Sequence, residues 1–179
     1  NGANYENIQC NASSPLIKNC IIRHSSGAGV STLSHDANPR LIDCQIYNNT
    51  CGVYANPGIA QITGGTISYN SNYGLCINET EAGAPSTTVD NVHIQGNAGY
   101  GIYIDSATST PLITNCLIAS NNSGSSGYGI HVNNGALPVI GGTSGDGNSF
   151  SGHITQAVFN NSGSTCIDAQ YNYWGQAGG

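Results

Sequence analysis

The sequence predicts an all-β fold, a parallel β-helix (β-solenoid) of about seven rungs of 21–27 residues with three short strands per rung. Three observations predict it. A phrase of a dozen residues recurs along the chain, apolar residues alternate in steps of two, and 25 of the 179 residues are glycine. Steps of two are the period of a strand, and glycine disfavours long helices. We therefore interpret residues 1–179 as a single repetitive domain.

The recurring phrase sets the register of the repeat. It reads "PLIKNCIIRHSS" at 15–26, "PRLIDCQIYNNT" at 39–50 and "PLITNCLIASNN" at 111–122. One copy holds too few apolar residues to form a core, so the copies must stack at the strand spacing of about 4.8 Å. We expect rungs to start near Pro15, Pro39, Ala60, Thr87, Pro111 and Pro138, with a terminal rung over 154–175.

One column of the repeat carries asparagine just after the second apolar stretch of each rung. Asparagine tolerates the left-handed backbone of a tight turn, and stacked side-chain amides can hydrogen-bond from rung to rung. The column therefore predicts a structural ladder of Asn49, Asn70, Asn97 and Asn121.

The seven cysteines fall into two groups. Cys20, Cys44 and Cys116 share an inward column, and Cys10 occupies another inward position, where thiols act as small hydrophobes. Cys20 and Cys44 lie on consecutive rungs, within the Cα separation of a disulfide, so a bridge between them is an alternative interpretation. Since no two cysteines are separated by two residues, a zinc site is not predicted. The remaining cysteines are expected to face outward: Cys51, Cys76 and Cys166.

Two phrases of the repeat resemble those of the right-handed parallel β-helix superfamily: "P-x-(I/L)-x-N-C-x-I-x-x-N" and "Y-G-I-x-I". Two further segments resemble ones common in its bacterial secreted or surface members: "VIGGTSGDGNSFSG" (139–152) and "IDAQYNYWG" (167–175). The resemblance spans about residues 5–175 and implies the right-handed fold. It implies no single activity, because the superfamily includes polysaccharide lyases, glycoside hydrolases, adhesins and phage tailspikes.

The charge of the chain argues against several partners. Only three side chains are lysine or arginine, and the formal net charge is −6. Binding of nucleic acid needs a basic cluster, so we expect no nucleic acid as partner. No apolar run approaches the eighteen residues of a spanning helix, so no membrane insertion is expected. Amides and hydroxyls in place of charges are typical of extracellular or cell-surface solenoids.

No catalytic cluster emerges from the repeat. Asp43 and Asp90 fall in neighbouring columns two rungs apart, about 10 Å, at the limit for an inverting glycosidase pair. Lyases of the superfamily rely on a basic groove and acidic calcium ligands, which three scattered basic residues do not supply. The histidines stand singly. We therefore expect no catalytic residues, no metal and no cofactor. A polar turn explains Asp43 better, because its column also holds Asn19, Asn91 and Asn115.

Aromatic residues gather in two outward columns beside the repeated glycine. Stacked tyrosines can stabilise the ladder that carries them, or can offer a rigid amphipathic surface to glycans or another protein. Both interpretations stay open at this point. The stripe contains Tyr54, Tyr73, Tyr100, Tyr103 and Tyr128, with His131 in the same column.

Acceptor motifs for N-glycosylation occur at five asparagines, no more often than chance allows in a chain so rich in asparagine, serine and threonine. They are Asn11, Asn48, Asn78, Asn121 and Asn160.

From the sequence we expect an extracellular structural scaffold that stacks end to end into a filament or surface fibre, because neither end carries a cap helix over its strand edges. The alternative is a carbohydrate-binding or carbohydrate-processing module that uses the tyrosine stripe. A third possibility is a piece of a larger adhesin.

Overall fold

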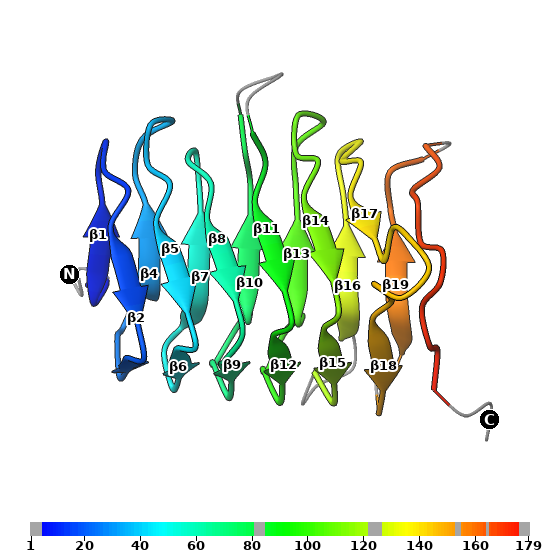
Figure 1. Cartoon of the computed structure of the whole chain (residues 1–179), viewed down its shortest axis with the longest axis horizontal. Coiled ribbons are helices and arrows are strands. Elements are labelled where there is room, and N and C mark those ends of the chain that lie inside the picture. The colour runs from blue at the N-terminus through cyan, green and yellow to red at the C-terminus, as the bar shows by residue number, and fades with distance from the viewer. Residues whose placement is uncertain (1–4, 81–84, 122–126, 153–154, 164, 176–179) are drawn as a thin grey trace.

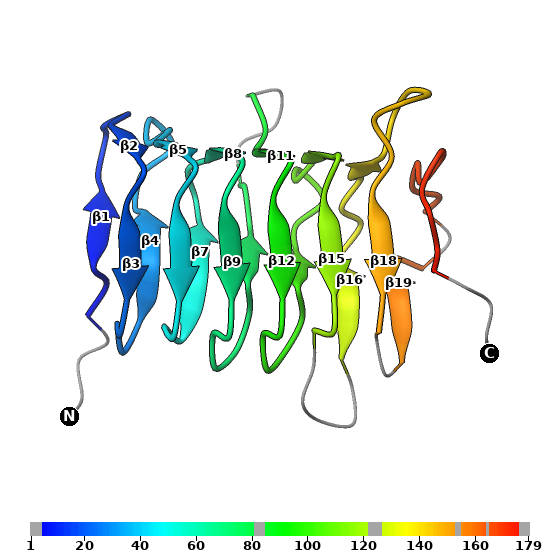
Figure 2. The same ribbon diagram turned by 60° about the horizontal axis from the view of Figure 1, so that its bottom comes forward.

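The computed structural model describes residues 5–80, 85–121, 127–152, 155–163 and 165–175. In this part of the chain every named element is a strand, and every paired strand runs parallel to its neighbour. The strands wind into a three-sided prism, whose turns follow one another along a single axis (Figure 1). The N-terminus and C-terminus lie at opposite ends of this prism (Figure 2).

Each side of the prism is one sheet. Sheet A consists of β1 (Ile8–Cys10), β4 (Ala28–Thr32), β7 (Cys51–Ala55), β10 (Leu75–Ile77), β13 (Ile102–Ile104), β16 (Tyr128–Val132) and β19 (Gln156–Asn160). Sheet B consists of β2 (Leu16–Lys18), β5 (Arg40–Ile42), β8 (Gln61–Thr63), β11 (Thr88–Asp90), β14 (Leu112–Thr114) and β17 (Val139–Ile140). Sheet C consists of β3 (Ile21–Arg23), β6 (Gln45–Tyr47), β9 (Thr66–Ser68), β12 (His93–Gln95), β15 (Leu117–Ala119) and β18 (Ser149–Ser151).

The predicted all-β solenoid with three strands per turn is confirmed, with about six turns where about seven rungs were expected. Six complete turns run from β2–β3–β4 to β17–β18–β19, preceded by β1. The region 154–175 does not form a further complete turn, because it contributes β19 and isolated bridges at Asp168 and Tyr173.

Apolar columns inside the prism form one continuous core. In sheet C, Ile94 lies between Ile67 and Ile118, in register with both, and no part of its side chain reaches solvent. Each such isoleucine contributes about 1.5–3 kcal/mol by burial. The same column begins at Ile22 and continues through Phe150, which stacks on Trp174 with ring centroids 5.0 Å apart. The repeat register therefore follows the core as expected.

Left-handed residues make the corner between sheets B and C. Backbone φ is +55° at Asn19, +51° at Asp43, +54° at Asn91 and +55° at Asn115. Asparagine and aspartate tolerate this conformation better than other residues with a side chain. The interpretation of Asp43 as a polar turn residue is therefore confirmed.

The predicted asparagine ladder exists and is buried. The Nδ2 of Asn70 donates to Oδ1 of Asn97 at 2.9 Å, and the Nδ2 of Asn97 donates to Oδ1 of Asn121 at 2.8 Å. Each Oδ1 also accepts the backbone N–H of the preceding asparagine, such as Asn70 N to Asn97 Oδ1 at 3.1 Å. Asn49 continues the ladder through Asn70 in the same way. The amides therefore supply partners for backbone groups that would otherwise be buried alone.

The prediction that the ladder asparagines themselves adopt the left-handed backbone is wrong. The positive φ lies one residue earlier, at Asn48, Tyr69 and Ser120. That residue turns the chain, and the following asparagine then points its side chain into the prism. The repeated glycine on sheet A makes room for the ladder, because a Cβ on Gly74 would lie 2.7 Å from Nδ2 of Asn97.

The predicted burial of the inward cysteine column is confirmed for Cys44 and Cys116 but is wrong for Cys20. Cys44 and Cys116 are buried, whereas Cys20 is exposed although it occupies the same column. Its turn is the first complete one, and no earlier strand of sheet B or C covers it in the part of the chain that the structure describes. Beyond Cys116 the column changes residue type and becomes a second amide ladder, in which Asn148 Nδ2 donates to Asn172 Oδ1 at 3.0 Å.

We predict that Asn97→Leu destabilises the fold by at least about 2 kcal/mol. The substitution leaves the buried N–H groups of Asn70 without their acceptor and the carbonyl of Ile67 without its side-chain donor. Urea denaturation followed by far-UV circular dichroism measures the change. Asn72→Leu, at an exposed position two residues beyond a ladder asparagine, is the matched control. Equal stability of the two variants would contradict a structural role for the ladder.

Candidate functional site

The aromatic stripe assembles as the sequence predicted. The ring centroids of Tyr73 and Tyr100 lie 5.4 Å apart and those of Tyr100 and Tyr128 5.5 Å apart, with nearly parallel planes. Tyr103 stacks on Tyr73 at 5.3 Å. Phe159 extends the stack by packing on Tyr128 at 4.5 Å. The sequence reasoning missed Phe159. In the structure this residue pairs with His131 in the register of β16 and β19, so extending the aromatic column by one more repeat would have found it.

The stripe covers two thiols that were expected to face outward. Cys51 and Cys76 lie apart from the main core, as expected for outward-facing residues, but they are buried beneath tyrosines. Burial raises the pKa of the Cys76 thiol to about 12 and that of Cys51 well above its usual value. Since the thiolate is the reactive form, neither side chain is a good nucleophile.

Tyr54 and Tyr103 carry hydroxyl groups that are already engaged. The hydroxyl of Tyr54 accepts a hydrogen bond from Asn56 Nδ2 at 2.7 Å. The hydroxyl of Tyr103 donates to Asp105 at 3.3 Å and accepts from Asn133 Nδ2 at 3.2 Å. Half-buried rings with satisfied hydroxyls favour the interpretation that the stripe stabilises sheet A.

His131 lies among the tyrosines without a conventional hydrogen bond. Its ring meets Tyr100 edge-on, with centroids 4.7 Å apart and planes at 88°, and it also contacts Tyr103 and Tyr128. Both ring nitrogens are buried, and neither has a hydrogen-bond partner among the described residues. Burial lowers the pKa of His131, and the nearby Asp105 only partly opposes this. The stripe therefore holds a neutral imidazole.

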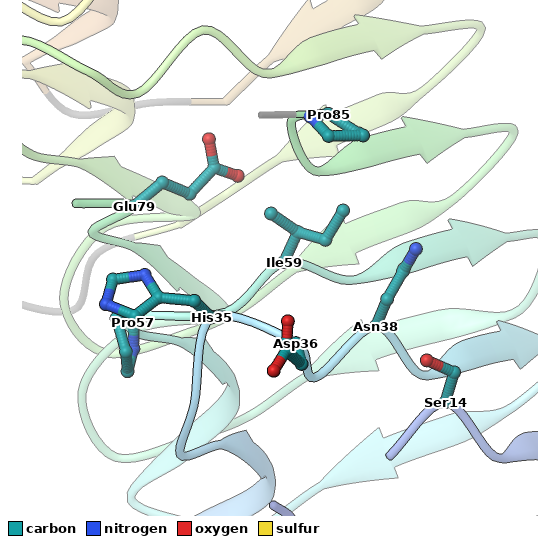
Figure 3. A pocket seen from close by; sticks show the side chains of 8 residues that line it. All are labelled: Ser14, His35, Asp36, Asn38, Pro57, Ile59, Glu79 and Pro85. Carbon is teal, nitrogen blue, oxygen red and sulfur yellow. The ribbon is translucent and has the colours of Figure 1, made fainter. Parts of the chain in front are cut away.

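A cavity of about 260 Å³ lies over the loops that lead from sheet A to sheet B (Figure 3). Its carboxylates are Asp36, which is exposed, and Glu79, which is buried. Glu79 accepts hydrogen bonds from the Thr87 amide at 2.6 Å and from the Ser86 hydroxyl at 2.8 Å, so it also holds its own loop. Among the described residues, the lining consists of Ser14, His35, Asp36, Asn38, Pro57, Ile59, Glu79 and Pro85.

Sequence reasoning missed this cavity. Its residues come from four different turns and lie in loops of unequal length, outside the aligned columns. Proline and isoleucine give it apolar walls, while carboxylate, amide, imidazole and hydroxyl groups supply both donors and acceptors. No lysine or arginine lines it, so the lining has no permanent positive charge to attract an anionic ligand.

The first strands of sheets B and C form an open edge. The amides of Arg40 and Gln45 each donate to a carbonyl one turn earlier at 2.9 Å. Leu16 and Ile21 occupy the same register positions in the preceding turn. Their amides therefore point along the axis, away from the prism, and find no acceptor among the described residues. A hollow of about 320 Å³ at this end is lined by Asn7, Ile8, Ile21, Ile22 and Arg23.

The structure sorts the glycosylation candidates by access. Asn11 and Asn48 are exposed, and Asn78 and Asn160 are half-buried, with Asn160 Nδ2 donating to the carbonyl of Thr165 at 2.8 Å. Asn121 is fully buried in the ladder, where its Nδ2 donates to the Ile94 carbonyl at 2.8 Å. A glycan on Asn121 is therefore incompatible with the folded chain.

Within the described ranges, no three His, Cys, Asp or Glu side chains lie close enough together to hold a metal ion. Over the same residues the structure contains no helix with the length and apolar character needed to cross a membrane.

We predict that stability falls below about pH 6.5 because of His131. The folded chain holds the imidazole neutral, while the unfolded chain takes up a proton near that pH. The contribution is complete above about pH 6.5 and is lost as the pH falls towards the lower pKa of the folded state. Urea midpoints between pH 7.5 and 5 should decline less for His131→Phe than for the parent chain. His93→Phe, at an exposed histidine, should keep the parent's decline; if it matches His131→Phe, the assignment to His131 is wrong.

Comparison with known proteins identifies the family. No curated protein and no solved structure matches the chain. The family model described as "Right handed beta helix region" matches residues 6–172, nearly the whole of the solenoid. The three parallel sheets, the stacked core columns and this match together show that the chain belongs to the right-handed β-helix family.

Proposed function

We propose that the chain is an extracellular structural module that extends by adding a further β-helix end to end at its open edge. The observation that carries the proposal is the unpaired edge of β2 and β3. An exposed strand edge is a template for another parallel strand. Head-to-tail contacts between identical chains that do not close into a ring extend into a filament or surface fibre.

The residues at this edge suit strand addition. Leu16 and Ile21 are 59% and 60% exposed, and β2 and β3 contain no proline. Their charged residues, Lys18 and Arg23, are exposed and do not point into the core. Natural proteins use proline and inward-pointing charges to block edges. Ile22 and the half-buried Ile17 present the ends of core columns beside the unpaired amides. A second turn on this edge would gain backbone hydrogen bonds and cover apolar surface together.

The surface composition supports a location outside the cell. Only 7% of the residues are charged, and the outer faces rely on amides, hydroxyls and stacked rings.

We predict that Ile21→Pro prevents end-to-end assembly and leaves the fold intact. Proline removes the amide that points to the open edge, and that amide makes no hydrogen bond within the described chain. Negative-stain electron microscopy over a concentration series should show filaments of the parent chain and single particles of the variant.

Ile21→Ala is the matched control, because it removes the same side chain but keeps the amide. It should still assemble, with an assembly concentration raised by about tenfold or less through loss of apolar contact. Monodisperse parent chain at all concentrations would contradict the proposal. Assembly of Ile21→Pro equal to that of the parent would place the contact elsewhere.

A second candidate function is binding of a neutral sugar in the loop cavity. The specific observation is the combination of proline walls with donors and acceptors in about 260 Å³, a size below that of a drug-sized ligand. The engaged hydroxyls of Tyr54 and Tyr103 make the tyrosine stripe a weaker candidate for sugar binding than this cavity.

We predict that Asp36→Asn weakens any glycan binding found on an array by about tenfold or more, because it removes a charged acceptor from the cavity. Asp43→Asn is the matched control, since it removes one exposed carboxylate at another corner and asparagine fills the same turn position in other rungs. An array without signal for the parent chain would reject this candidate. Equal loss of glycan binding in both variants would indicate that the net charge of the chain, and not the cavity, determines the binding.

A further inference from the structure

Cys20 and Cys44 occupy equivalent positions on the first two complete turns. Ile17 pairs with Leu41 before them and Ile22 pairs with Ile46 after them. The Gln45 amide donates to the Cys20 carbonyl at 2.9 Å, which brings the two turns into contact at this point. The cysteines are thus neighbours across one strand spacing, although they are 24 residues apart in sequence.

Their side chains adopt matching orientations. The Sγ of Cys20 lies 3.3 Å from the Lys18 carbonyl oxygen, and the Sγ of Cys44 lies 3.4 Å from the Ile42 carbonyl oxygen. One strand spacing, about 4.8 Å, falls within the Cα separation of about 4.4–6.8 Å that a disulfide spans. Because the two residues are related by one strand spacing, their Cβ atoms are also about 4.8 Å apart. A disulfide has a Cβ–Cβ separation of about 3.8 Å, so the two Cβ atoms must approach by about 1 Å.

The end of the solenoid can make this shift more easily than its interior. The first complete turn is held by a following turn, but among the described strands none precedes β2 or β3 in its sheet. An interior turn would have to break contacts on one side in order to move towards the other.

Exposure distinguishes the roles of the two thiols. Cys20 is exposed, whereas Cys44 is buried directly behind it. Both are free thiols in the structure. The only other exposed cysteine within the described residues is Cys166, near the opposite end of the chain. Cys20 is therefore the accessible thiol that has a second thiol as its stacked neighbour.

We propose that Cys20 and Cys44 form a redox pair that a low-molecular-weight disulfide converts into a bond between the first two complete turns. The Cys20 thiolate attacks one sulfur of the small disulfide, whose S–S bond breaks and releases one thiolate. Cys44 then loses its proton to solvent and attacks the Cys20 sulfur, and the second small thiolate leaves. Two protein thiols are oxidised, and one small disulfide is reduced to two thiols.

The disulfide would stabilise the first complete turn, whose strands β2 and β3 have a described neighbour on one side only. It would link the corner between β2 and β3 to the corner between β5 and β6, so fraying of the first turn becomes harder. Burial raises the pKa of the Cys44 thiol, so the closing step is faster at higher pH. The chemistry does not depend on end-to-end assembly.

The test is incubation of the reduced full chain with oxidised glutathione, below the concentration at which filaments form. Peptide mass spectrometry should find a Cys20–Cys44 peptide, and titration of thiols in unfolded protein should fall by two per chain. The melting temperature should rise by a few degrees and return after reduction.

Three variants keep the test falsifiable. Cys44→Ser should stop at a glutathione adduct on Cys20, and Cys20→Ser should form neither product. Cys166→Ser is the matched control that removes the other exposed thiol, and it should still form the bond. A lasting glutathione adduct on Cys20 of the parent chain, or a Cys20 bond between two chains, would overturn the proposal. Loss of filaments in Ile21→Pro would leave this result unchanged.

Discussion

The structure depends on one constraint: each turn must place its residues in register above the equivalent residues of the previous turn. Parallel hydrogen bonds impose this register on all three sheets. A residue such as Ile94 is then stacked between its own equivalents, Ile67 and Ile118, within one core that all three sheets share. Because the neighbours of each turn are the adjacent turns, stability accumulates along the axis and is lowest where a turn lacks a neighbour.

At the corners of the prism, this constraint requires particular types of residue. A left-handed residue such as Asn91 turns sheet B into sheet C, and another, such as Ser120, precedes each ladder asparagine. The side chains of Asn97 and the other ladder asparagines then hydrogen-bond backbone groups that the turn would leave buried without partners. The fold thus combines an apolar core with buried amides, which is possible because every amide meets an equivalent amide one turn away.

The same constraint explains the outer surface. Repetition places Tyr73, Tyr100 and Tyr128 over one another, so their rings stack. Tyr54, Tyr73 and Tyr103 pack over Cys51 and Cys76. A ladder of this kind needs no ligand to account for it. The features that repetition does not explain are the loop cavity around Asp36, the unpaired edge at Ile21 and the pair of Cys20 with Cys44, and the proposals concern these three.

The sequence by itself determined the solenoid, the strands per turn, the core columns, the asparagine ladder and the tyrosines of the aromatic stripe, although not Phe159 at its end. A repeat can be aligned without coordinates, because equivalent residues have equivalent neighbours. Only the tertiary structure decided properties that depend on non-equivalent neighbours. Cys20 is exposed because no described strand of sheet B or C covers its turn, and Cys76 is buried because tyrosines of its own and adjacent turns pack over it. The cavity likewise joins Ser14 to Glu79 through loops whose lengths follow no repeat.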